Sequence, residues 1–224
     1  MTEAPTVDTT MFVMTHRAFE RDAQRLLDAL GTDPTDPERV AALGRAWTLF
    51  HDLLEHHHRA EDEVLWPALA AAHPEADGIV ERMADQHHQL DGLLTSANQV
   101  IPGWAADPDA TRCEDARNAV GPIAELLATH LTDEESTAVP LIRQHLPLDG
   151  WAAFTGYNMQ LNAGIEWTIP WLAEGQSDDV RARIWSLVPD PVRTGPAAGW
   201  CDSYIANLEH AFGAPAPAVH PPFT

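Results

Sequence analysis

A histidine and a glutamate with helical spacing interrupt an apolar stripe in the stretch 50–69. His57 and Glu61 lie four residues apart, a spacing that places two side chains roughly 6 Å apart on one face of a helix. The expected face also carries Phe50, Leu54, Val64, Leu65 and Ala68. Because an isolated buried charge is very costly, a carboxylate on this core-facing stripe needs a partner or a metal ion.

The same pair recurs later in the chain. His130 and Glu134 repeat the spacing on a second apolar stripe, made of Ile123, Leu127, Leu131, Ala138 and Leu141. An offset of 73 residues maps His57 onto His130 and Glu61 onto Glu134, and it also relates a proline that follows each pair. The repeat indicates two halves of a duplicated helical unit.

Two more histidines are followed four residues later by an acid. These pairs are His16 with Glu20 and His87 with Asp91. A step of one residue turns a helix by about 100°, so His87 and His88 cannot both point at the bundle axis. His87 is expected to point inward, because it shares its face with Val80, Met83, Leu90 and Leu94. Asp91 is then placed to orient the His87 imidazole or to reach a metal ion itself.

The ionisable neighbours of the first pair are interpreted as a solvated helix surface. They fall mostly on the other faces of the expected helix, and they are His51, Glu55, His56, His58 and Asp62.

The inward-facing candidates point to a site for two metal ions. There are six of them: His16, His57, Glu61, His87, His130 and Glu134. This set exceeds what one tetrahedral zinc ion needs, and a mixture of imidazole and carboxylate suits iron or manganese better than soft copper. Carboxylates can bridge two ions, so the two glutamates are the expected bridges. The alternative is a bundle in which these groups pair with one another without metal, but buried pairs rarely recover their cost of desolvation.

Four amphipathic helices are expected to position these residues, at about 10–30, 36–72, 75–100 and 110–145, with a bend near Pro67. Short connections predict an all-α, up-down-up-down four-helix bundle over residues 1–148. Residues 149–224 hold five of the eight tryptophans and predict a short helical extension packed on the bundle. About the last ten residues are proline-rich and are expected to be disordered.

Composition limits the partners. The formal charge is −21, with 34 acidic residues against 13 basic ones, which argues against binding nucleic acid or an anionic membrane surface. No apolar run approaches the ~20 residues that a membrane span requires. The N-terminus does not resemble a signal peptide, so a cytoplasmic location is expected. The sequence leaves two roles for the extension: it covers the apolar core of the bundle, or it forms the interface of a homodimer.

The motifs as a set resemble a known family. THRAFE, HHRAEDEVLWPAL, DQHHQL and HLTDEESTAVPL, spread over residues 10–146, are similar to the hemerythrin-like (HHE cation-binding) domains. The resemblance implies a four-helix bundle with a non-haem di-iron centre, two iron ions with an oxo or hydroxo bridge, that binds dioxygen or related small molecules. It assigns the ligands to His16, His57, Glu61, His87, His130 and Glu134. Residues 149–224 are similar to a tail of some bacterial members.

One departure from the oxygen carriers of this family bears on function. The carriers have a second histidine four residues after the first in the third helix, whereas this chain has Asp91, which argues against simple reversible oxygen carriage. We therefore expect a protein that binds or reacts with dioxygen, peroxide or nitric oxide, in sensing or in detoxification. The alternatives are a di-iron oxidase of a small organic substrate, with the extension shaping the pocket, and a metal-sensing or storage module. Whether the protein is an enzyme stays open.

Overall fold

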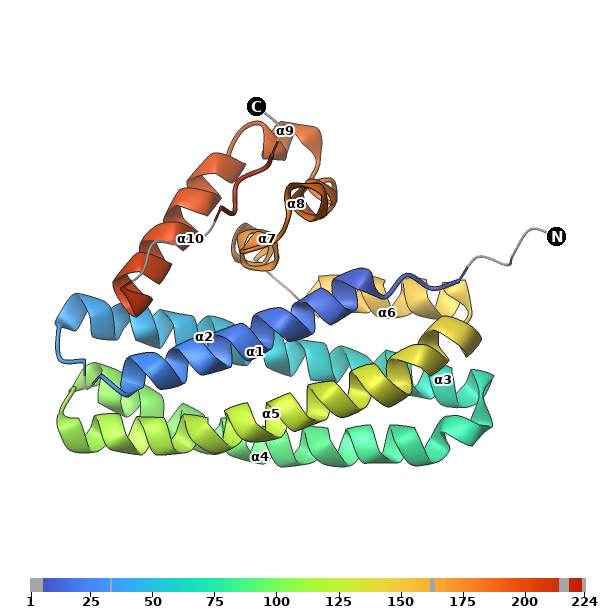
Figure 1. Ribbon diagram of the computed structural model, residues 1–224, viewed down its shortest axis with the longest axis horizontal. Coiled ribbons are helices and arrows are strands. Elements are labelled where there is room, and N and C mark those ends of the chain that lie inside the picture. Colours follow the sequence, from blue (N-terminus) through green and yellow to red (C-terminus); the bar gives the residue numbers. More distant parts are fainter. Residues whose placement is uncertain (1–5, 33, 162–163, 214–217, 223–224) are drawn as a thin grey trace.

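Four long helical segments form an antiparallel bundle (Figure 1). The computed structural model describes residues 6–32, 34–161, 164–213 and 218–222. The bundle consists of α1 (Thr10–Leu30), a second segment that joins α2 (Pro37–Ala60), η1 (Glu61–Leu65) and α3 (Trp66–Ala72), then η2 (Pro74–Ala76), α4 (Asp77–Ala106) and α5 (Ala110–His145). The expected all-α, up-down-up-down four-helix bundle is confirmed.

Capping residues set two of the helix starts. The Asp36 side chain accepts a hydrogen bond from the Arg39 amide at 2.9 Å, and Pro37 is the first residue of α2. Asp109 accepts from the Arg112 amide in the same way at the start of α5. In both places the aspartate satisfies a backbone donor that the first helical turn leaves unpaired.

The third helix is longer than its sequence suggests. We expected α4 to end near Val100, before Pro102, but it continues to Ala106. The proline removes only one backbone donor, and the buried residues on either side of it, Ile101 and Trp104, extend the apolar stripe of the helix. Apolar burial outweighs the missing hydrogen bond at this position.

The second helix is interrupted by a π turn rather than by a simple proline bend. In η1 the Trp66 amide donates to the carbonyl of Glu61, five residues earlier. Pro67 follows directly and has no amide hydrogen to donate to Glu63, which favours the wider turn. Single π turns inside α-helices occur frequently at functional sites, and this one begins at a candidate metal ligand.

Two apolar cores occupy the bundle, one on each side of the buried ionisable residues. The larger includes Phe19, Phe50 and Leu94, and the smaller includes Phe12 and Met83. Along α4, for example, His87 lies between Met83 of one core and Leu90 of the other. The polar cluster is therefore a layer across the middle of the bundle, closed from both ends.

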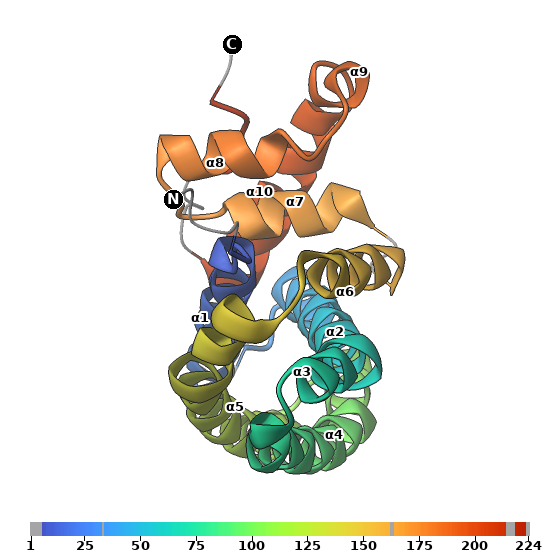
Figure 2. The ribbon, with the colours of Figure 1, turned by 90° about the vertical axis from the view of Figure 1, so that its right-hand side faces the viewer.

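The C-terminal extension lies against the α1–α2 side of the bundle (Figure 2). It contains α6 (Leu148–Leu161), α7 (Ile165–Ala173), α8 (Asp178–Trp185), α9 (Asp190–Arg193) and α10 (Ala197–Phe212). The Trp171 ring packs 5.0 Å from that of Phe19, and its indole N–H donates to Asp22 at 2.7 Å. Aromatic packing and a buried hydrogen bond thus join the extension to α1.

A buried carboxylate strengthens the same junction. Glu174, 2% exposed, accepts from the Tyr204 hydroxyl at 2.8 Å and pairs with Arg25 at 2.7 Å and Arg21 at 3.1 Å.

Of the last residues, Val219 is buried and its carbonyl accepts from the Trp185 indole at 2.9 Å. The disorder expected for residues 214–217 and 223–224 falls outside the described residues. Within the described parts of the chain, no helix is both long enough and apolar enough to span a membrane.

Candidate metal centre

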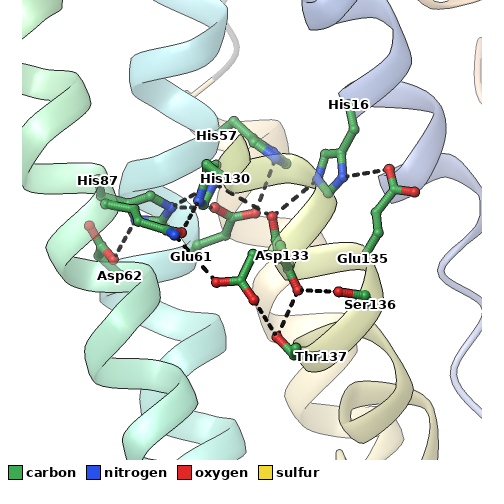
Figure 3. A network of polar contacts seen from close by, with 12 residues as sticks. His16, His57, Glu61, Asp62, His87, His130, Asp133, Glu135, Ser136 and Thr137 are labelled. Atoms are coloured by element: carbon green, nitrogen blue, oxygen red, sulfur yellow. Dashed lines mark hydrogen bonds and ion pairs between the residues drawn. The ribbon is translucent and has the colours of Figure 1, made fainter. Parts of the chain in front are cut away.

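The structure brings all six inward candidates together in one buried cluster. Figure 3 shows His16, His57, Glu61, His87 and His130 of this cluster. Each side chain comes from one of the four helical segments of the bundle and is nearly inaccessible: the residue exposures are 0 to 2% for His16, His57, Glu61, His87, His130 and Glu134. His88, one residue from His87, is exposed. The rotation expected for α4 is therefore confirmed.

The cluster divides into two groups that could each hold an ion. The ligand atoms within each group lie within 4.8 Å of one another, and the groups are His58, Glu61, His87 and His130, and His16, His57 and Glu61. Glu61 belongs to both groups. A carboxylate that offers one oxygen to each side is the arrangement expected of a bridging ligand.

The second glutamate also connects the two groups. The Oε2 atom of Glu134 lies 3.4 Å from Nε2 of His16 and 3.7 Å from Nε2 of His130. Glu61 has the corresponding contacts, with Oε1 3.0 Å from Nε2 of His57 and Oε2 3.4 Å from Nε2 of His87. Each carboxylate thus touches a histidine of both groups.

Acceptors outside the cluster fix the tautomer of three histidines. Each ring places Nδ1 against an oxygen: His16 against Glu135 at 3.1 Å, His87 against Asp62 at 2.8 Å, and His130 against Gln86 at 2.9 Å. Because these oxygens can only accept, Nδ1 carries the hydrogen and the lone pair of Nε2 points into the cluster. The Gln86 amide nitrogen in turn donates to Asp133, so its oxygen faces His130.

These tautomers leave the interior short of hydrogen-bond donors. The Nε2 atoms of His87 and His130 lie only 3.3 Å apart, and two facing lone pairs at that distance repel unless a cation lies between them. Both carboxylate oxygens of Glu61 and of Glu134 have no hydrogen-bond partner, nor has either ring nitrogen of His57. Buried polar atoms without partners are costly, and metal ions would satisfy all of them. The residues present therefore fit a metal centre.

When no cation is present, burial favours the uncharged form of five of these side chains, His57, His58, His130, Glu61 and Glu134. Burial, and then repulsion by neighbouring imidazoles, holds the pKa of His57 and of His58 well below the usual value, and burial lowers the pKa of His130 to about 3. Burial also raises the pKa of Glu61 well above its usual value, with further repulsion from Glu134, whose own pKa burial raises. A bound cation reverses this balance for the carboxylates.

The interpretation of His58 as a solvated residue was wrong. His58 is 2% exposed, and its ring stacks on that of His87 with a 4.1 Å centroid separation and a 16° interplanar angle. Neither ring nitrogen has a hydrogen-bond partner. The reason is that His58 lies one turn after buried Leu54, and α2 packs against both α1 and α4, so the inward arc of the helix accommodates two adjacent histidines.

The orienting role expected of Asp91 belongs to another residue. Asp62, which we had placed on the solvated surface, holds Nδ1 of His87 from the neighbouring helix and keeps 40% of its side chain exposed. Asp91 itself is exposed, as is Glu20. The sequence analysis also did not identify Glu135 and Gln86, which accept from His16 and His130, or Asp133, which accepts from Gln86.

Aromatic rings line the apolar walls of the cluster. Ring centroids lie 4.5 Å apart for Phe12 and His16, 5.4 Å for Phe19 and His57, and 6.5 Å for Trp66 and His87. Because these walls are apolar, they exclude water and lower the local dielectric constant, which strengthens the electrostatic interactions within the cluster.

Comparison with known proteins agrees with this geometry. The family model for the hemerythrin HHE cation binding domain matches residues 7–142, more than half of the 224 residues. The matched segment contains α1 to α4, nearly all of α5 and every member of the cluster. No curated protein and no solved structure matches the chain. The chain belongs to the hemerythrin HHE cation-binding family.

Proposed function

We propose that the cluster holds two iron ions and that the protein binds or reacts with dioxygen, peroxide or nitric oxide, in redox sensing or in detoxification. The observation that carries the proposal is the pair of buried ligand groups that share Glu61. His16, His57, His58, His87 and His130 would supply nitrogen ligands, and Glu61 and Glu134 would bridge.

The donor set favours iron. Imidazole nitrogens suit zinc, copper, iron and nickel, while carboxylates suit harder ions such as manganese, and iron accepts both. The two connected groups contain six buried donor residues, and Glu134 lies against a histidine of each group. This set exceeds the four donors that a structural zinc ion uses. When bound, a pair of irons supplies the one-electron steps that reactions with dioxygen, peroxide and nitric oxide require.

The protein's own residues would position and isolate the ions. Asp62, Glu135 and Gln86 hold three imidazoles with Nε2 inward, which raises their basicity as ligands and fixes their orientation. The aromatic walls and the exposures of 0 to 2% restrict access to small molecules. Such a closed centre fits a small oxidant better than a bulky substrate.

Metal analysis tests the proposal directly. Protein purified without oxygen from iron-replete cells should contain two irons per chain, and its optical spectrum should change on addition of dioxygen, peroxide or nitric oxide. Glu61→Ala should lose both ions, because Glu61 belongs to both groups. Glu20→Ala is the matched control, since Glu20 also follows a histidine by four residues but is exposed. One zinc per chain in the wild-type protein would refute the di-iron assignment.

The second candidate is a di-iron oxidase of a small organic substrate. One observation favours it: a pocket of about 540 Å³ lies between the bundle and the extension, with Leu53 and His56 of α2 on one side and Trp167, Tyr204 and Phe212 on the other. None of the described residues that line this pocket belongs to the ligand groups. The pocket therefore ranks below the closed centre as an indication of function.

A further inference from the structure

A second pocket, of about 720 Å³, opens between α2–η1 and α4. Its walls carry four carboxylates, from Glu55, Asp62, Glu63 and Asp91, against one guanidinium, from Arg59. The Arg59 guanidinium forms an ion pair with Glu63, with Nε 2.8 Å from Oε1. The remaining three carboxylates have no arginine among the residues that line the pocket, so the mouth is electronegative.

The inner wall of this pocket includes a buried ligand group. His58 lines the pocket yet is only 2% exposed, and both of its ring nitrogens have no hydrogen-bond partner. On its other side it stacks on His87 and belongs to the group that contains Glu61. One imidazole thus separates an acidic surface pocket from the buried cluster.

We propose that this pocket is the route by which divalent cations reach the centre, and that His58 is the first buried ligand they meet. This inference rests on the proposed metal centre and adds the path and the charge of what travels along it. Asp62 marks the same path, because it lines the pocket and holds His87 at 2.8 Å. A cation that leaves the mouth therefore passes from solvated carboxylates to His58 and then to Glu61.

Charge and packing favour this side of the cluster over the side that faces α1. A cleft lined by charges of one sign concentrates ions of the opposite sign and speeds their association. The walls that face α1 are closed by Phe12 and Phe19, whose rings pack on His16 and His57. The acidic mouth would hold back anions and would not affect a neutral oxidant.

The rate of metal uptake tests the route independently of any reaction of the loaded protein. Apoprotein is mixed with cobalt(II) in a stopped-flow instrument, and the visible absorption of the bound ion is followed. The variant Glu55→Gln/Asp91→Asn should take up cobalt roughly tenfold more slowly at low salt. Glu114→Gln/Asp115→Asn changes the charge equally at exposed positions of α5 and should load at the wild-type rate. The difference between the two variants should shrink as salt is added.

A second pair of variants tests the pocket without removing a carboxylate. Thr95 lines the pocket and its exposed neighbour Ser96 does not. Thr95→Arg should therefore slow uptake several-fold more than Ser96→Arg, because only the first guanidinium enters the pocket.

The possible results separate the route from the centre. Equal rates in every variant, with full final cobalt content, would overturn the route and leave the centre in place. A lower final content in Glu55→Gln/Asp91→Asn would show that these carboxylates hold bound ions, which would also overturn the route. Wild-type protein that takes up no metal would overturn the proposed centre, and the route with it.

Discussion

Asp62 and Glu135 should each control the affinity of a different metal ion. Asp62 holds His87, which belongs to one ligand group, and Glu135 holds His16, which belongs to the other. Asp62→Asn and Glu135→Gln keep the size of each side chain and remove its charge. Each variant should weaken the ion on its own side more than the ion on the far side.

The structure sets the size of the effect. Asp62 accepts one hydrogen bond at 2.8 Å with 40% of its side chain exposed, and Glu135 accepts one at 3.1 Å with 33% exposed. A hydrogen bond to a charged group contributes about 1 kcal/mol more than a neutral one. Replacement of such outer partners costs about 10- to 100-fold in metal affinity. Because both carboxylates are partly solvated, we expect the lower end, about tenfold or 1.4 kcal/mol.

The assay is an equilibrium titration of apoprotein with cobalt(II) in the presence of a competing chelator, which resolves two binding steps. Asp62→Asn should weaken one step and Glu135→Gln the other, and the double variant should weaken both. Asp85→Asn, at an exposed position of α4, is the control and should change neither. Equilibrium measurement matters here because Asp62 also lines the acidic pocket, where its loss would slow uptake.

Two results would contradict this reasoning. If both variants weakened the same step, the two groups would not be separate ion sites. If neither variant changed affinity, the outer carboxylates would not set the orientation of His87 and His16.

Three other predictions follow from the fold and the site. His87→Ala should lower metal content and alter the optical spectrum, whereas His88→Ala, at an exposed position, should do neither; the reverse outcome would mean that α4 is rotated. Glu174→Ala should cost about 2–3 kcal/mol in urea denaturation, because it leaves two partly exposed arginines without their buried acid, while exposed Glu209→Ala should stay within about 0.5 kcal/mol. Apoprotein should lose stability as the pH falls from about 6.5 toward 3, by up to about 1.4 kcal/mol per pH unit. The reason is that His130 binds a proton in the unfolded chain over this range, whereas in the folded protein its pKa is about 3 and it stays neutral. A free energy of unfolding that rises on acidification would show that proton uptake by the buried carboxylates dominates.

The sequence was sufficient for the bundle and for six members of the cluster because both depend on local periodicity. The apolar residues three and four positions from a residue such as His130 show which face of the helix carries its side chain. This pattern can be recognised without knowing where the neighbouring helices lie. The residues of α5 that are buried between Ile123 and Ile142 have the predicted spacing. The π turn could not be predicted, because Pro67 is compatible with either a bend or a wider turn.

The outer acceptors were missed for a different reason. The residues that hold His16, His87 and His130 come from positions 119, 25 and 44 residues away along the chain. Such contacts depend on the rotation and height of two helices relative to each other, which periodicity within one helix does not contain. Asp91 was chosen because it lies one turn beyond His87 on the same helix, whereas the acid in contact with His87 is Asp62, on the neighbouring helical segment.

His58 shows what the local pattern did contain. Phe50, Leu54 and His58 follow one another at intervals of four residues, as do Leu53 and His57. Two such rows, 100° apart, describe a helix that is buried against two neighbours rather than one. The two ligand groups that share Glu61 each take one histidine from these rows, His58 in one group and His57 in the other. The two adjacent histidines of α2 are both buried because α2 packs against both α1 and α4, whereas α4 contributes only His87 and keeps His88 in solvent.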